Sequence, residues 1–357
     1  MTTKRTTQIF TFLSHCRARW LPLFAVCVTA VTIAQDSDTI TASVDSYLSS
    51  KMIGHIRSVE TAVFNEYWSE ADSLIKCLRQ ENVAGPLIFL LSAARLEAEM
   101  FASEDNSREN EFKALLDSAQ AGFEYKLQTT RDSAALYYFL GSCKANRALW
   151  ESKFGSIFKA IKQGVNAKND FQRGLALDSS LYDLHAGLGA YRYWKSAKSG
   201  ILRWTGIISD ERSAGIEEVR LAIDSAAISS EGAKSALIWI LMNEKEYREA
   251  VALAAELHER FPGGTTFLWP LAECYRKLNM YNLALETYLQ IRERLLLQPG
   301  NQINLIKVDY EVLLLARTLE DDSTIQVVAA GFDEYSSDTP RKTRRKLSGK
   351  YRALNRL

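Results

Sequence analysis

Residues that could carry chemistry are scattered through this sequence rather than gathered into motifs. His55, His185 and His258 lie far apart, and "ELHERF" around His258 does not form a cluster because neighbouring residues of a helix point to different faces. The sequence contains no GxSxG, no glycine-rich phosphate loop and no HExxH. We therefore predict a protein without catalytic residues, a bound cofactor or a metal site.

The cysteines support the same interpretation. Cys77, Cys143 and Cys274 follow the apolar N-terminal segment, widely spaced and without a CxxC pair. An odd number of such cysteines is typical neither of a disulfide framework nor of a zinc site. Each falls in a helical apolar pattern, so we expect all three to pack as small hydrophobic side chains.

The N-terminus has the layout of a secretory signal peptide. Basic residues precede an apolar run over 20–34, and the first acidic residue is Asp36. The run is shorter than the roughly 20 residues that span a bilayer, and it ends in the small residue Ala34. We predict a signal peptide over 1–34, cleaved after Ala34, and export to the periplasm or cell envelope. An uncleaved membrane anchor and a mitochondrial transit peptide are the alternatives.

Overall charge gives no indication of a nucleic-acid partner. The chain of 357 residues has 44 Lys and Arg against 43 Asp and Glu, a balance that creates no global field. Since an exported protein also rarely meets nucleic acid, we expect none as a partner.

Helical periodicity dominates from about Thr41 to the C-terminus. Apolar residues recur at spacings of three and four, no stretch alternates convincingly as a strand does, and breaks such as Gly85-Pro86 and Pro262 separate segments that hold two helices each. We predict an all-α protein with an N-terminal helix or linker over 35–51, a repeat array over 52–336 and a basic C-terminal helix over 337–357.

Two of these segments are copies of one another. Leu237, Tyr247 and Ala250 recur 34 residues later as Leu271, Tyr281 and Ala284. With its repeats at 231–264 and 265–298, the chain resembles the tetratricopeptide repeat family, in which an alanine lets two short helices cross closely. The chain departs from the family's pattern at Leu241, Ala254 and Leu296, and the family's usual tryptophan is replaced by Lys234 and Leu268. The resemblance implies an α-solenoid of antiparallel helix pairs forming a right-handed superhelix.

The same resemblance implies a binding site. In this family the first helix of each pair lines a concave groove that holds a protein or peptide. The matching positions are Tyr138, Tyr193, Trp239, Met242, Trp269, Glu273 and Arg276. Aromatic side chains often anchor partners at interfaces, but these rings could instead fill the interior of a tightly wound superhelix.

The last residues form a strongly basic segment. From Thr339 onward the chain has no acidic residue. One interpretation is a polar helix that caps the array, and the other is a contact with an anionic membrane surface. The residues that would make this contact are Arg341, Lys342, Arg344, Arg345 and Lys346.

Together these patterns favour a non-catalytic protein-protein interaction scaffold of the bacterial cell envelope, with a protein or peptide in its concave groove. The alternative is a peripheral membrane protein held by the basic C-terminal helix.

Overall fold

The computed structural model describes residues 49–80, 85–129, 133–199, 209–298, 301–337 and 339–356. These ranges contain sixteen helices and no strand, which confirms the predicted all-α fold. The proposed signal peptide over 1–34 lies outside the described residues, as does 35–48.

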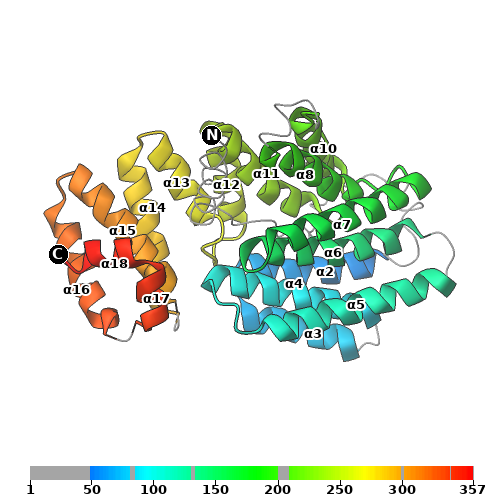
Figure 1. Cartoon of the computed structure of the whole chain (residues 1–357), viewed down its shortest axis with the longest axis horizontal. Coiled ribbons are helices and arrows are strands. Elements are labelled where there is room, and N and C mark those ends of the chain that lie inside the picture. Colours follow the sequence, from blue (N-terminus) through cyan, green and yellow to red (C-terminus); the bar gives the residue numbers. More distant parts are fainter. Residues whose placement is uncertain are drawn as a thin grey trace, which may run out of the picture.

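The helices follow one another as pairs along an α-solenoid (Figure 1). The first helices of the pairs are α2 (Ser50–Phe64), α4 (Gly85–Ser103), α6 (Ala134–Lys153), α8 (Asp183–Lys198), α11 (Ser230–Glu244), α13 (Leu268–Lys277) and α15 (Gln302–Thr318). The second helices are α3 (Trp68–Gln80), α5 (Glu109–Thr129), α7 (Ile157–Leu177), α10 (Arg212–Ser225), α12 (Tyr247–Arg260), α14 (Tyr281–Leu296) and α16 (Asp322–Ser336). Two short helices follow, α17 (Arg341–Lys346) and α18 (Ser348–Leu354).

Small residues let the helices of a pair approach closely. Ala250 and Ala284 are fully buried where their helices pack. Between α8 and α10 the spacing is closer still, because a Cβ added to Gly189 would lie 2.6 Å from the carbonyl oxygen of Gly215. Larger residues at such positions would force the backbones apart.

One corner geometry recurs between the two helices of a pair. Five first helices are followed, within two residues of their ends, by a residue with left-handed backbone: Glu66, Glu104, Lys245, Asn279 and Glu320. The amide of the next residue then donates to a carbonyl five positions earlier, at 2.8 to 3.2 Å. This bond satisfies a carbonyl that the end of a helix would otherwise leave unpaired.

The chain also makes contacts across about 200 residues of sequence. Glu66, at the α2–α3 corner, accepts hydrogen bonds from the backbone amides of Thr265 at 2.7 Å and Thr266 at 3.1 Å, and from both threonine hydroxyls. Phe64 packs against Phe261 and Phe267, with ring centroids 5.0 and 5.2 Å away. The first pair therefore docks onto the linker between α12 and α13.

A second long-range contact lies one pair further along. At the α4–α5 corner the carbonyl of Ala102 accepts from Asn304 Nδ2 at 2.6 Å, and Glu104 forms an ion pair with Lys307 of α15. The corners of the first two helix pairs therefore contact the α12–α13 linker and α15.

The basic C-terminal segment differs from the single helix that the sequence predicted. It turns at Leu347 between α17 and α18. The turn lets Leu354 become buried and brings Tyr351 to a centroid distance of 5.1 Å from Phe332 of α16. Packing of these two side chains explains why the segment is not straight.

Within the described ranges, no helix is both long and apolar enough to cross a membrane.

Candidate functional site

Helices α11 and α13 carry the predicted groove residues that remain partly accessible. Trp239, Met242, Trp269 and Arg276 are all half-buried. Trp269 meets Tyr288 edge to face at a centroid distance of 6.2 Å, so one edge of its indole is supported by α14. Helices α11 and α13 are in contact, which places the two tryptophans on neighbouring first helices.

Glu273 belongs to the interior rather than to a contact surface. It is 2% exposed, and Arg276 donates to its two carboxylate oxygens at 2.8 and 2.5 Å. These hydrogen bonds raise the pKa of Arg276, while burial and then the Glu273 charge raise the pKa of the Tyr288 phenol. Glu273 therefore holds Arg276 in place, and its predicted contact with a partner does not fit its burial.

Tyr193 is wholly inaccessible, so its predicted groove position is corrected. Its hydroxyl donates to Glu244 at 2.7 Å and accepts from Asn243 at 2.6 Å, and burial raises its pKa. The ring fills the space between α8 and α11, because these first helices pack directly against each other.

Tyr138 is corrected for a similar reason. It is 2% exposed and lies among Phe139 and Phe171, at centroid distances of 5.2 and 6.4 Å. The interpretation that rings fill the interior therefore holds for α6 and α8.

Cys77 departs from the sequence prediction, whereas Cys143 and Cys274 follow it. Cys143 and Cys274 are buried, and burial raises the pKa of the Cys274 thiol to about 12. Cys77 is exposed on α3.

All five predicted anionic-surface residues are exposed, but two of them also contact the protein. Arg344 donates to the carbonyl of Thr339 at 2.8 Å, and Lys346 lies 3.5 Å from Glu104. Arg341, Lys342 and Arg345 form no ion pair with another described residue. The exposed positive charge is therefore concentrated on α17.

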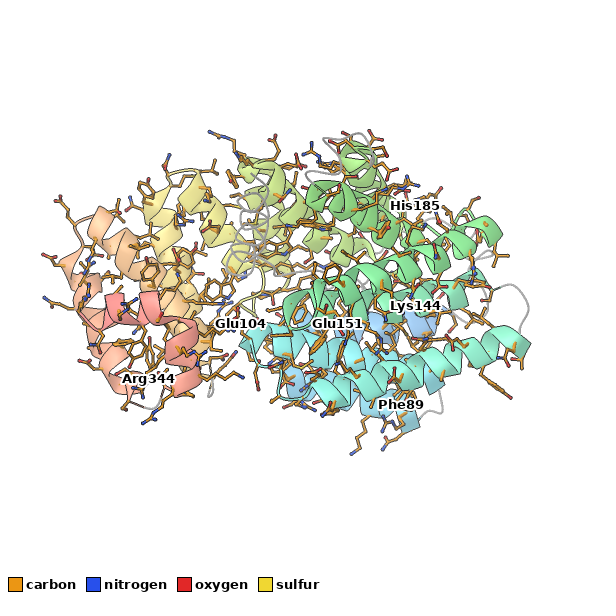
Figure 2. The ribbon with its side chains drawn as sticks, viewed as in Figure 1. Phe89, Glu104, Lys144, Glu151, His185 and Arg344 are labelled. Atoms are coloured by element: carbon orange, nitrogen blue, oxygen red, sulfur yellow. The ribbon has the colours of Figure 1, made fainter. Side chains whose placement is uncertain are left out.

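The sequence did not reveal a charged cluster around the α4–α5 corner. Glu104 lies between the N-terminal and C-terminal helices (Figure 2) and is surrounded by Lys153, Lys307 and Lys346. Burial alone would raise its pKa, but the three lysine charges outweigh burial and lower it to about 2. Lys153 donates to the carbonyl of Phe101 at 2.9 Å, and burial lowers its pKa to about 8. These residues come from four separate elements, so no local motif could indicate them.

The cluster joins helices from distant parts of the chain. Its carboxylate, Glu104, faces lysines, and among the described residues no three His, Cys, Asp or Glu side chains come together in a way that could hold a metal ion. The histidines that could act as acids or bases stay on separate helices, α2, α8 and α12.

Comparison with known proteins yields only a distant structural similarity. No family model matches the chain, and no curated protein matches it. Among solved structures, a monomeric mutant of IFIT1 with m7Gppp-AAAA is similar at a TM-score of 0.37 and 10% identity. The alignment covers 86% of this chain and 60% of that one, so this chain spans less than two thirds of its length.

Proposed function

We propose that this protein is a non-catalytic interaction scaffold of the bacterial cell envelope that binds a peptide segment of a partner against α11 and α13. Trp239, Met242 and Trp269 would contact apolar side chains of that segment, and Arg276 would offer a fixed positive charge beside them. Export to the envelope belongs to the proposal and rests on the signal-peptide pattern over 1–34.

One observation carries the proposal. Trp239 and Trp269 are only partly covered by the protein, whereas the corresponding aromatic side chains of α6 and α8 are buried. Tyr138 and Tyr193 are 2% and 0% exposed, whereas Trp239 and Trp269 are half-buried. When a partner covers a large aromatic side chain that is partly accessible in the free protein, burial of the ring contributes strongly to the binding free energy.

The polar surroundings favour a peptide over a small apolar ligand. Arg276 is held by Glu273, so its guanidinium keeps one orientation. A fixed guanidinium on the same helix as the Trp269 indole matches the mixture of carbonyl groups and apolar side chains that a peptide presents.

The test compares capture by the wild-type chain with capture by the double variant Trp239→Ala, Trp269→Ala. Partners retained from an envelope extract are identified by mass spectrometry, and their affinity is then measured by titration. Losing an anchoring aromatic typically costs about 2 kcal/mol, so two would lower affinity roughly a thousandfold if their effects add.

A matched control removes an aromatic side chain elsewhere. Tyr125 is 67% exposed on α5, away from α11 and α13, so Tyr125→Ala should leave capture unchanged. Circular dichroism checks that the double variant keeps its helix content. If the double variant unfolds at a lower temperature than wild type, both indoles belong to the core instead. If the double variant is folded and captures partners as well as wild type does, the proposed peptide site on α11 and α13 is excluded.

The alternative, a peripheral membrane protein held by its C-terminus, is supported by the exposed charges of Arg341, Lys342 and Arg345. Deleting the segment cannot test it, because Leu354 is buried in the core. Substituting these three residues by Gln removes the charge and leaves α18 packed. Loss of membrane association in that variant, with peptide capture intact, would favour the alternative.

A further inference from the structure

Helix α7 has an apolar surface that is wider than the part buried against other described residues. Ala160, Ala167 and Phe171 are buried toward the neighbouring helices. On the outer side, Ile157 and Ile161 are 55% and 58% exposed, and Phe158 is 82% exposed. We call these three residues the α7 outer face.

The α7 outer face is continuous on the helix surface. At about 100° per residue, Ile157, Ile161 and the half-buried Val165 lie along one stripe, with Phe158 beside it. The equivalent second helix α12 carries Arg248, Glu249 and Glu256 on its exposed side instead. The repeat architecture therefore does not require an apolar surface here, and large apolar side chains gathered in the open usually mark an interaction site.

Positive charge accompanies this apolar surface. Lys159, Lys162 and Lys168 lie on the same helix, and no acidic residue occurs between Glu151 and Asp170. At the α6–α7 corner, Lys153 feels the charges of Lys307 and Lys346 as well as those of the carboxylates Glu104 and Glu97. An apolar face flanked by lysines is complementary to an anionic lipid surface, where apolar side chains enter the interface and lysines meet headgroups.

We propose that the α7 outer face inserts into an anionic membrane surface, with Phe158 as the deepest side chain and Lys159 and Lys162 at the headgroups. Pairing with a second copy of the chain is less suitable. In a two-fold contact each patch meets itself, so the lysines of one copy would face those of the other.

A probe at position 158 tests insertion directly. Phe158→Cys is introduced into the full chain, with Cys16, Cys27 and Cys77 replaced by Ser, and labelled with an environment-sensitive fluorophore. Cys143 and Cys274 are buried and stay unlabelled. The matched control places the label at the exposed position of α5 by Tyr125→Cys. Vesicles of equimolar phosphatidylcholine and phosphatidylglycerol are compared with vesicles of phosphatidylcholine alone.

We expect the emission at position 158 to rise and shift to the blue with anionic vesicles only, and the emission at position 125 to stay unchanged. A flotation assay measures how much of the otherwise native chain binds the vesicles. The bound amount should fall by at least about tenfold in the triple variant Ile157→Ser, Phe158→Ser, Ile161→Ser. These residues are exposed, so the triple variant keeps its fold.

The local probe separates this inference from other modes of membrane attachment. If the N-terminal apolar run or the basic residues of α17 alone bind vesicles, flotation occurs while the emission at position 158 does not change, and the inference is overturned. An equal change with neutral vesicles overturns it too. If the emission at position 158 changes with protein concentration in the absence of vesicles, the α7 outer face is a self-association surface. That result also overturns the inference.

Discussion

Removing the Glu66 carboxylate should weaken the docking of the first helix pair onto the α12–α13 linker. Its Oε1 atom accepts four hydrogen bonds from Thr265 and Thr266, at 2.7 to 3.2 Å, and Glu66 and Thr265 are both buried. In Glu66→Ala the hydroxyls can rotate toward other acceptors, but the amide of Thr265 stays fixed and buried without a partner.

The expected cost follows from these groups. A buried donor left unpaired costs about 1–3 kcal/mol, and loss of hydrogen bonds to a charged acceptor costs about 1.5–3 kcal/mol. Because the amide of Thr266 is only partly buried and water can replace part of its bond, we expect Glu66→Ala to lower the free energy of unfolding by about 2–4 kcal/mol. Glu66→Gln keeps an acceptor oxygen and should cost about half as much.

Equilibrium urea unfolding followed by circular dichroism measures this effect. Because the contact joins residues 199 positions apart, its loss should also reduce cooperativity, seen as a smaller slope or a second transition. Glu70→Ala, an exposed substitution in the same pair, serves as the control and should change stability by less than about 1 kcal/mol. A Glu66→Ala chain that unfolds within about 0.5 kcal/mol of wild type, with the same slope, would refute the reasoning.

Three further predictions concern packing, pH and processing. Ala250→Leu or Ala284→Leu should each cost about 1–3 kcal/mol, because both alanines are fully buried; unchanged melting temperatures would contradict the repeat register. Glu104 has a folded-state pKa of about 2 against 4.5 in the unfolded chain, so its contribution, at most about 3 kcal/mol, is present above pH 4.5 and is lost as pH falls toward 2. Glu104→Gln should flatten that part of a stability-pH profile, and an unaltered profile would argue against the lysine contacts. Mass spectrometry of the envelope fraction should find a chain beginning at or near residue 35, whereas intact Met1 in the cytoplasm would exclude export.

The predictable part of the fold follows from local pattern. The helical spacing of apolar residues indicated the paired helices, and Ala250 and Ala284 are fully buried. The left-handed corners could not be predicted in this way, because glycine is the usual signal for such a corner. Here Glu66, Lys245 and Asn279 adopt the conformation instead, and the hydrogen bonds that follow them stabilise it.

The site was less predictable because exposure depends on contacts distant in sequence. Register within a repeat indicates that Tyr193 and Trp239 point to the inner side of the solenoid, and it does not indicate what lies opposite. Tyr193 meets the end of α11 and is buried, whereas Trp239 is only half covered. The charged cluster around Glu104 gave no signal for the same reason, since its members lie up to 242 positions apart.

These long-range contacts also limit where a partner can bind. The corners at Glu66 and Glu104 dock onto the α12–α13 linker and onto α15, so the N-terminal pairs occupy part of the surface that an open array would offer to a ligand. The half-buried Trp239 and Trp269 lie on first helices, α11 and α13, that do not carry these docked corners. If docking by Glu66 restricts access to these tryptophans, then Glu66→Ala should raise peptide affinity while it lowers stability. If both properties fall together, the docked corner instead helps to hold α13 in its binding position, because Thr265 and Thr266 directly precede that helix.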